Sequence, residues 1–229
     1  MKRIIYLFIL YTIISCTESQ INIEPVKIEH EYVDFGLPSG TLWATCNLGA
    51  STPEDYGYYY AWGETIPKSE YKWSNYMWCD KTDNSMTKYV TEDAYGLTDH
   101  EGDLDYTNEL ELSDDAAHVN WGEDWRMPSS EQVNELLQLV PWECVTRNGV
   151  RGILLSRNNA AVFLPFAGEY GETENNRCLY WTRTHKIDSR NSNRASCYYI
   201  FLFNQGRMSV AERCKGYTIR PVRCKNIND

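Results

Sequence analysis

The chain has 229 residues, of which 42% are hydrophobic and 24% charged, with a mean hydropathy of −0.54. This composition is typical of a soluble globular protein and excludes a polytopic membrane protein and a disordered chain. The formal net charge of −10 argues against a nucleic-acid ligand, because phosphate binding needs a basic surface.

The first elements in chain order are a charged start and an apolar run. Lys2 and Arg3 precede residues 4–14, which are all apolar or aromatic apart from Thr12. As a helix this run would span only about 16 Å of a hydrocarbon core of about 30 Å. We therefore predict a signal peptide over residues 1–15 rather than a membrane-spanning helix.

The end of this run carries a lipidation signal. Ile14-Ser15-Cys16 resembles the lipobox of bacterial lipoproteins, which implies cleavage before Cys16 and acylation of that residue. Acyl chains would anchor the protein to a membrane without spanning it. The expected location is the bacterial cell envelope, on the outer membrane and facing the exterior. An ordinary secretory signal followed by an incidental cysteine is the alternative.

Residues 16–30 form the second predicted part of the chain, a lipidated cysteine and a flexible tether. The segment is polar and acidic, contains Pro25 and shows no clear periodicity. A flexible chain of this length has an r.m.s. reach of about 20 Å. Residues 31–229 are the third part and are expected to form one domain, because no low-complexity linker interrupts them.

Short aromatic segments bounded by Gly, Pro and Asn follow from residue 32 and predict antiparallel strands. The sharpest turn is Asn148-Gly149, which predicts a hairpin of strands 143–147 and 150–155. The other expected strands lie at 41–46, 57–62, 160–164, 179–184, 197–203, 207–213 and 217–223.

Two short helices are expected, at about 114–121 and 130–140. Ser129 and Gln132 have the spacing of a capping box at the start of the second helix. Four apolar side chains follow at helical spacing: Val133, Leu136, Leu137 and Val140. The few helices and many strands predict the α+β class, dominated by antiparallel strands.

Seven cysteines remain after Cys16: Cys46, Cys79, Cys144, Cys178, Cys197, Cys214 and Cys224. An exported chain can keep disulfides, and an odd number leaves at least one thiol without an internal partner. If Gln205-Gly206 is a two-residue hairpin loop, Cys197 and Cys214 face each other and form the expected disulfide. The absence of a CxxC pair argues against structural zinc.

The polar segment 168–177 (GEYGETENNR) is the candidate ligand loop. Its candidate binding residues are Glu169, Glu172, Asn175 and Asn176, whose oxygens and amides suit sugar hydroxyls or Ca²⁺. The alternative is a variable solvated loop. No other cofactor is expected.

The segment 92–115 holds ten acidic residues and no Lys or Arg. We expect a solvated loop, with a Ca²⁺ site built from some of Asp99, Asp103, Asp105 and Glu109 as the alternative. His118 follows Asp114 and Asp115 at helical spacing, and a structural role is expected there over a metal or acid–base role.

Aromatic and basic residues complete the set of expectations. The 17 Tyr and 8 Trp exceed what the core needs, and at least one of Tyr58, Tyr59 and Tyr60 should point outward. Tryptophans such as Trp121 and Trp125 are assigned to the core. Arg220 lies in a segment expected to be buried and needs a partner, for which Asp34 or Asp114 are the candidates.

Several blocks, in order, carry a family resemblance: YVDFGLPSGTLWATCNLGA (32–50), PEDYGYYYAWGET (53–65), LSDDAAHVNWGEDWRMP (112–128), FLPFAG (163–168), YWT (180–182) and GYTIRPV (216–222). From about residue 32 to 224 the chain resembles the Fibrobacter succinogenes major paralogous domain family. The resemblance implies a C-type-lectin-like fold with paired terminal strands and long loops on one side. Val90 stands where relatives often carry a cysteine, which leaves Cys79 as the first candidate for the unpaired thiol.

The sequence lacks the HExxH, GxSxG, GxGxxG and P-loop motifs, so a non-catalytic role is expected. The leading hypothesis is a surface-anchored lipoprotein module for glycan or protein recognition or adhesion, with no nucleic-acid partner. One alternative is a structural accessory or tip subunit of a surface assembly. Another is an enzyme related to the formylglycine-generating enzymes, which would need Cys214 and Cys224 close together.

Overall fold

The computed structural model describes residues 29–83, 85–90, 108–122, 124–172, 176–185, 194–201 and 205–224. Cys16, the signal peptide and most of the predicted tether lie outside the described residues, as do Asp99, Asp103, Asp105 and Asn175. In the described residues no helix is both long and apolar enough to cross a bilayer.

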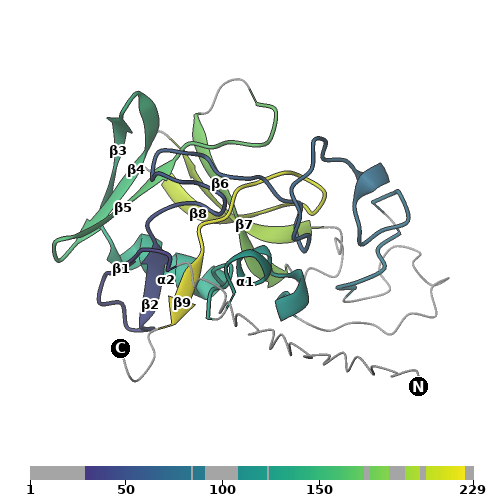
Figure 1. The fold of residues 1–229 in the computed structure, drawn as a ribbon, viewed down its shortest axis with the longest axis horizontal. Helices are drawn as coiled ribbons and strands as arrows, with labels where there is room; N and C mark the ends of the chain where they lie inside the picture. The colour runs from purple at the N-terminus through teal and green to yellow at the C-terminus, as the bar shows by residue number, and fades with distance from the viewer. Residues whose placement is uncertain are drawn as a thin grey trace, which may run out of the picture.

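Three small antiparallel sheets, shown in Figure 1, organise the described residues into a mixed α+β fold. The first sheet has the order β1 (Tyr32–Asp34), β2 (Thr41–Ala44), β9 (Val222–Cys224). The second contains β3 (Trp142–Arg147), β4 (Val150–Arg157) and β5 (Ala160–Pro165). The third contains β6 (Arg177–His185), β7 (Arg194–Phe201) and β8 (Gln205–Glu212).

The helices are short and begin where capping side chains are available. In α1 (Ala116–Trp121), Asp115 is the N-cap, and its Oδ1 accepts from the backbone N–H groups of Ala117 and His118. In α2 (Ser130–Leu139) the predicted capping box is present, because Ser129 and Gln132 bond each other's backbone N–H groups. The described residues also form the 3₁₀ turns η1 (Trp73–Asn75) and η3 (Leu112–Asp114). Both predicted helices are therefore confirmed.

The β3–β4 hairpin forms at the predicted turn. Asn148 and Gly149 have φ values of 48° and 82°, which suit a two-residue loop between Arg147 and Val150. A second hairpin joins β4 to β5 through Asn158 and Asn159, whose φ values are 52° and 64°. Asparagine tolerates this left-handed backbone better than most residues, which explains a tight turn without glycine.

The β7–β8 hairpin has a different register from the expected one. Gln205 already belongs to β8 and pairs with Phe201, so the loop is not Gln205-Gly206. Cys197 lies opposite Ser209, and Cys214 lies beyond the end of β8. The predicted Cys197–Cys214 disulfide is therefore wrong, and both residues are free thiols. The cause is the loop length, because one changed loop residue shifts every facing pair.

The segment 57–62, which was expected to be a strand, is irregular. The backbone N–H groups of Tyr58 and Tyr60 donate to different segments, at Leu48 and Tyr217 respectively. A continuous β-ladder cannot form when successive residues bond to different segments. This segment has only an isolated bridge, between Tyr60 and Tyr217. The strand prediction is wrong here, although the aromatic side chains still pack as described below.

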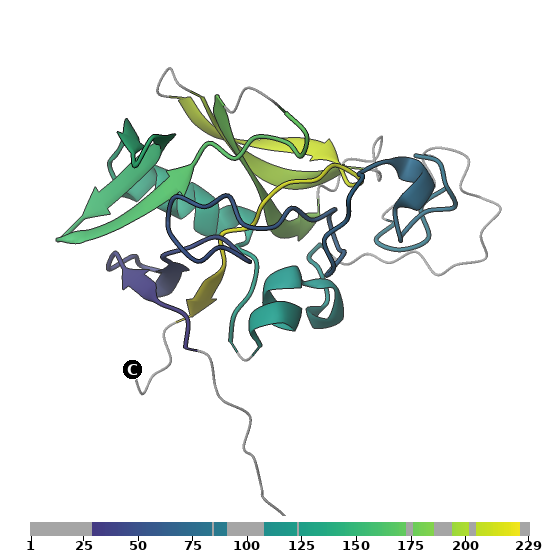
Figure 2. The same cartoon turned by 45° about the horizontal axis from the view of Figure 1, so that its top comes forward.

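The second and last strands pair, and β2 lies between β1 and β9 in the first sheet. Trp43 of β2 lies opposite Val222 of β9, so both ends of the described chain reach the same side of the molecule, as Figure 2 shows. The expected strand 217–223 is shorter than predicted, since β9 begins only after Pro221. Proline has no backbone N–H to donate to a ladder.

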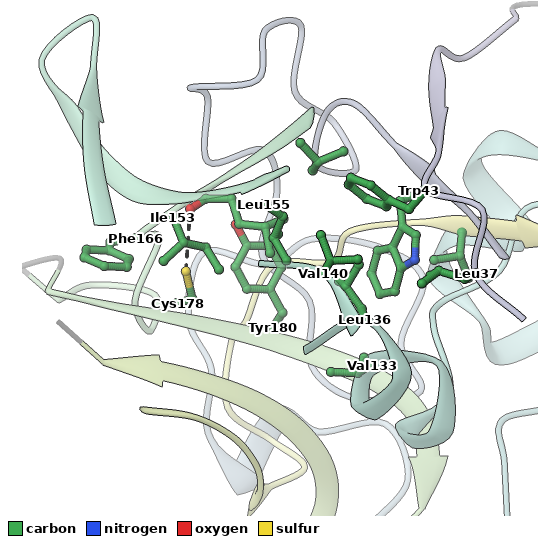
Figure 3. Packing of buried hydrophobic residues seen from close by; sticks show 14 residues of the cluster. Leu37, Trp43, Val133, Leu136, Val140, Ile153, Leu155, Phe166, Cys178 and Tyr180 are labelled. Carbon is green, nitrogen blue, oxygen red and sulfur yellow. Dashed lines mark hydrogen bonds between the residues drawn. The ribbon is translucent and has the colours of Figure 1, made fainter. Parts of the chain in front are cut away.

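One of the two large buried clusters includes the apolar face of α2 and side chains of the first and second sheets. Figure 3 shows Val133, Leu136 and Val140 of the helix region facing Trp43 and the β4 side chains. These three residues are at most 2% exposed, so the predicted apolar face of the helix is confirmed. Such side chains contribute about 1.5–3 kcal/mol each on burial.

Arg220 is fully buried, but its predicted carboxylate partners are elsewhere. Asp34 accepts a hydrogen bond from the backbone of Gly36, and Asp114 pairs with Lys88 at 2.7 Å. The Arg220 guanidinium instead donates to an amide oxygen and to backbone carbonyls. The prediction of an acidic partner is wrong, because enough neutral acceptors surround this guanidinium to satisfy its N–H groups.

Candidate functional site

Three tyrosines from distant parts of the chain meet at the surface, and we call this group the tyrosine ledge. It consists of Tyr59, Tyr71 and Tyr170. The ring of Tyr170 lies edge-on to the other two, with centroid distances of 4.9 Å to Tyr71 and 5.5 Å to Tyr59. Tyr170 is 42% exposed, whereas its two neighbours are half-buried. The ledge therefore presents one ring to solvent on a support of two others.

Hydrogen bonds fix the two supporting rings. The Tyr59 hydroxyl donates to the backbone carbonyl of Ala167 at 2.6 Å. The Tyr71 hydroxyl donates to the backbone carbonyl of Tyr59 and accepts from the backbone N–H of Lys68 at 3.0 Å. Burial raises the pKa of both phenols, so the two rings stay neutral at physiological pH.

Gly216 gives the ledge its close packing. The Tyr170 backbone N–H donates to the Gly216 carbonyl at 2.9 Å. A Cβ added at residue 216 would lie 2.7 Å from the Tyr71 ring and 2.9 Å from the Cβ of Tyr170. Only glycine leaves room for both tyrosines, so this residue couples the β5–β6 connection to the segment after β8.

Glu169 and Glu172, two of the predicted loop residues, lie on either side of Tyr170 in the sequence and form charge pairs. Glu169 binds the Lys215 ammonium at 2.9 Å, and this hydrogen bond raises the lysine pKa. Glu172 pairs with the Arg177 guanidinium and also accepts from the Glu169 backbone N–H at 3.1 Å. The four side chains are all partly exposed. These two carboxylates and two cations offer both hydrogen-bond acceptors and donors, and their charges balance.

Asn176, the third predicted loop residue in the described chain, is placed differently. Its side-chain oxygen accepts from Arg151 of β4 at 3.2 Å, so it contacts the second sheet. The structure therefore brings Glu169 and Glu172 to the ledge and directs Asn176 to a neighbouring element.

The expectation that a tyrosine of the run 58–60 points outward is confirmed, even though the run is not a strand. Tyr58 is 55% exposed and Tyr60 is 1% exposed, with Tyr59 between them in the ledge. The Tyr58 ring covers Gly49, where an added Cβ would lie 2.3 Å from the ring.

Sequence reasoning missed Tyr71, Lys215 and Gly216 as site residues. Tyr71 lies in an irregular segment, Lys215 precedes the block GYTIRPV, and Gly216 opens it. Their roles depend on tertiary contacts, of Tyr71 and Gly216 with Tyr170 and of Lys215 with Glu169. The motif beginning at Gly216 was the available signal, because a glycine between aromatic segments often marks a close approach.

Metal and thiol chemistry were the other sequence hypotheses. The described part of the chain contains no group of three or more His, Cys, Asp or Glu that could hold a metal ion. Glu109, one member of the alternative calcium set, pairs with Arg183 at 2.7 Å. Cys214 is buried, whereas Cys224 is exposed on β9 opposite Thr41. These two cysteines do not share the environment that a copper-binding pair requires.

The tryptophans follow the core assignment. Trp43, Trp62 and Trp181 are fully buried, and Trp125 is 5% exposed. Trp121 is half-buried, and the His30 imidazole stacks on it with a centroid distance of 3.8 Å. This stack holds the start of the described chain against α1.

Comparisons with protein-family models, with curated proteins and with solved structures found no match. The tyrosine ledge, with its exposed ring, its two charge pairs and its fixed support, is therefore the candidate site.

Proposed function

We propose that this protein is a surface-anchored lipoprotein whose domain, residues 31–229, recognises a glycan or a protein through the tyrosine ledge, without catalysis. One observation carries the proposal. Tyr170 is 42% exposed, while the half-buried rings of Tyr59 and Tyr71 and the close approach at Gly216 hold it in place. A single exposed ring is common on a protein surface, so the fixed support around Tyr170, rather than its exposure alone, favours a binding role.

The physical advantage of such a ring is low entropic cost on binding. A tyrosine has two side-chain torsions and an amphipathic ring, so it gives contact area without much loss of freedom. Because Tyr59 and Tyr71 are already hydrogen-bonded, the ledge needs little reorganisation when a ligand arrives. The flat ring face suits the apolar face of a sugar or an apolar side chain of a protein.

The flanking charge pairs favour a hydroxyl-rich ligand. Glu169 and Glu172 supply acceptors, whereas Lys215 and Arg177 supply donors. Sugar hydroxyls both donate and accept, and they can bond to such pairs without separating them. Since each carboxylate is already paired with a cation, the site has no excess charge to attract an ionic ligand.

The position of the ledge fits an anchored protein. The β5–β6 connection lies on one side of the molecule, and β1 and β9 lie on the other (Figures 1 and 2). A lipid at Cys16 would tether the domain through the chain that precedes β1. The ledge would then face away from the membrane, toward ligands outside the cell.

The proposed fold is C-type-lectin-like. Pairing of β2 with β9 and the long irregular segments between the sheets support this assignment. Membership of the Fibrobacter succinogenes major paralogous domain family remains our proposal from the sequence blocks alone.

A glycan array and pull-downs from host and microbial extracts test the function, using the full acylated chain in detergent micelles. We expect a ligand whose binding weakens at least tenfold in Tyr170→Ala and persists in Tyr58→Ala, which removes a more exposed ring outside the ledge. Each assay is run with Ca²⁺ and with a chelator. The absence of any glycan or protein ligand in both conditions would contradict the proposal.

A second function is favoured by one separate observation. Ile66 and Met77 are 71% and 60% exposed, and both adjoin the turn held by buried Glu64, which accepts from the Met77 backbone at 2.7 Å. Val119, which is 50% exposed, neighbours Asn120, and Asn120 donates to the backbone of Thr65 in that turn. Exposed apolar side chains on segments that are linked in this way favour contact with another protein.

This surface supports a role as an accessory or tip subunit of a surface assembly. Crosslinking in intact cells followed by purification of the full chain tests it. Ile66→Asp should remove the crosslinked partner and leave the Tyr170-dependent ligand bound. A chain that is recovered without partners, in both the original and the variant form, would exclude this role.

A further inference from the structure

A third buried cluster joins the segment 61–90 to the end of β8. Its buried members are Ala61, Tyr76, Met86 and Cys214, and Cys79 packs against them. Cys79 also forms an isolated bridge with Met86. The two cysteines therefore reach the same apolar cluster from segments that are 135 positions apart in the sequence.

The geometry around Cys79 keeps its thiol inside this cluster. Its sulfur donates to the backbone carbonyl of Trp73 at 3.2 Å and to that of Tyr76 at 3.7 Å. Burial, with a smaller contribution from Glu212, raises the pKa of Cys214 to about 12. The proximity of the two thiols is given by their packing in one cluster, in which Cys214 is buried and against which Cys79 packs.

We propose that Cys79 and Cys214 form a site of reversible oxidation, at which a disulfide crosslinks the segment 61–90 to the turn that follows β8. Among the described residues, these are the two cysteines that the third cluster brings together. An exported protein would meet the oxidising conditions that such a bond needs.

The reaction is a thiol–disulfide exchange with an external disulfide as the oxidant. The Cys79 thiolate attacks one sulfur of that disulfide, forms a mixed disulfide and releases one small thiolate. The Cys214 thiolate then attacks the Cys79 sulfur, forms the internal bond and releases the second small thiolate. The protons lost by the two cysteines pass through solvent to the released thiolates, so the external disulfide is reduced to two thiols.

The alternative pair, Cys144 and Cys178, is held more rigidly. These residues influence each other electrostatically, but both lie within paired strands, opposite Ile153 and Ile200. Cys79 lies outside the three sheets, and Cys214 lies in the turn after β8. A turn and an irregular segment can move to disulfide geometry, in which the Cβ atoms are about 3.8 Å apart, more easily than two ladder strands.

The crosslink would also reach the ledge, because Tyr71 packs against the same cluster. The inference does not depend on the proposed ligand. Failure to find a glycan or protein ligand would leave it untouched, and failure of the crosslink would leave the binding role standing.

Peptide mapping of the full chain tests the inference. The reduced protein in micelles is exposed to oxidised glutathione, unfolded, alkylated, digested without reductant and analysed by mass spectrometry. We expect a peptide that links Cys79 to Cys214. It should form over hours and faster at higher pH, because the attacking species is a thiolate. Oxidation should raise Tm by about 5–10 °C.

Serine variants supply the controls. Cys79→Ser and Cys214→Ser should each abolish the linked peptide and the rise in Tm, whereas Cys46→Ser should keep both. Recovery of alkylated Cys79 and Cys214 after oxidation, or of either one linked to a different cysteine, would overturn the inference. The map of the unsubstituted chain decides the question even if a variant does not fold.

Discussion

The Nε of Arg220 donates to the side-chain oxygen of Asn47 at 2.8 Å, and both residues are fully buried. The other guanidinium N–H groups donate to the backbone carbonyls of Ala44, Thr45 and Phe163. One buried charge thus connects β2, β5 and the segment that leads into β9. Neutral amide and carbonyl oxygens, rather than a carboxylate, stabilise this buried guanidinium.

This network predicts a large loss of stability when the guanidinium is removed. Arg220→Met should lower the free energy of unfolding by about 3–5 kcal/mol, since several buried acceptors lose their donors. Arg220→Lys should be nearly as damaging, because an ammonium cannot reach four separated acceptors in one plane. Urea unfolding measures both, with the exposed Arg207→Ala as the control. A loss below about 1 kcal/mol in Arg220→Met would contradict this interpretation.

Alanine should destabilise the protein at Gly216 because a side chain has no space there, and at Gly171 because the backbone conformation disfavours a side chain. Gly216→Ala places a Cβ against Tyr71 and Tyr170, so we expect a loss of about 1–3 kcal/mol and displacement of the ledge. At Gly171, with φ of 85°, nothing lies within 4 Å of an added Cβ, and alanine should cost only about 1–2 kcal/mol of backbone strain.

Ligand affinity distinguishes the two glycine variants. Gly171→Ala should keep the affinity of the ledge, whereas Gly216→Ala should weaken it together with stability. Equal affinities in the two variants, measured by calorimetry on folded protein, would show that the ledge tolerates a wider spacing.

The adjacent residues Ser129 and Ser130 at the start of α2 allow a matched comparison of two serine-to-alanine variants. The Ser129 hydroxyl accepts from the backbone N–H of Gln132 at 3.2 Å, so Ser129→Ala should cost about 1 kcal/mol. The Ser130 hydroxyl is buried and has no hydrogen-bond partner among the described residues. Ser130→Ala should therefore be neutral or slightly stabilising in urea unfolding. A larger loss at Ser130 than at Ser129 would contradict the capping assignment.

Cysteine reactivity should follow burial. Cys197 is 2% exposed, and burial raises its pKa to about 12, whereas Cys224 is exposed. Brief alkylation of the native reduced chain at pH 8 should modify Cys224 and spare Cys197. Because the unfolded thiol ionises at lower pH than the buried one, this group should also reduce stability as pH rises from about 9 to 12. Rapid alkylation of native Cys197 would contradict the observed register.

Local signals explain which parts of the fold the sequence could predict. The Asn148-Gly149 turn and the Ser129–Gln132 capping box depend on residues within four positions of each other, and both are present. The β7–β8 register depends on a loop length that no residue pattern marks unambiguously, and its prediction was wrong. The prediction of a β-strand at residues 57–62 was also wrong, since their backbone hydrogen bonds go to separate segments.

The candidate site was only half predictable for a similar reason. Glu169 and Glu172 belong to one polar loop and could be selected by composition. Tyr71 and Gly216 join them only through tertiary contacts across more than forty positions of sequence. The run of three tyrosines predicts at least one exposed ring, which is Tyr58, whereas the exposed ring of the ledge is Tyr170.

The most direct test of the recognition role is the affinity of the full acylated chain, with and without Tyr170→Ala, for the ligand that arrays and pull-downs select. Calorimetry should show at least a tenfold weaker Kd for the variant, with unchanged Tm and with Tyr58→Ala retaining the original affinity. Equal Kd values for the original chain and Tyr170→Ala would contradict the assignment of the ledge as the binding surface.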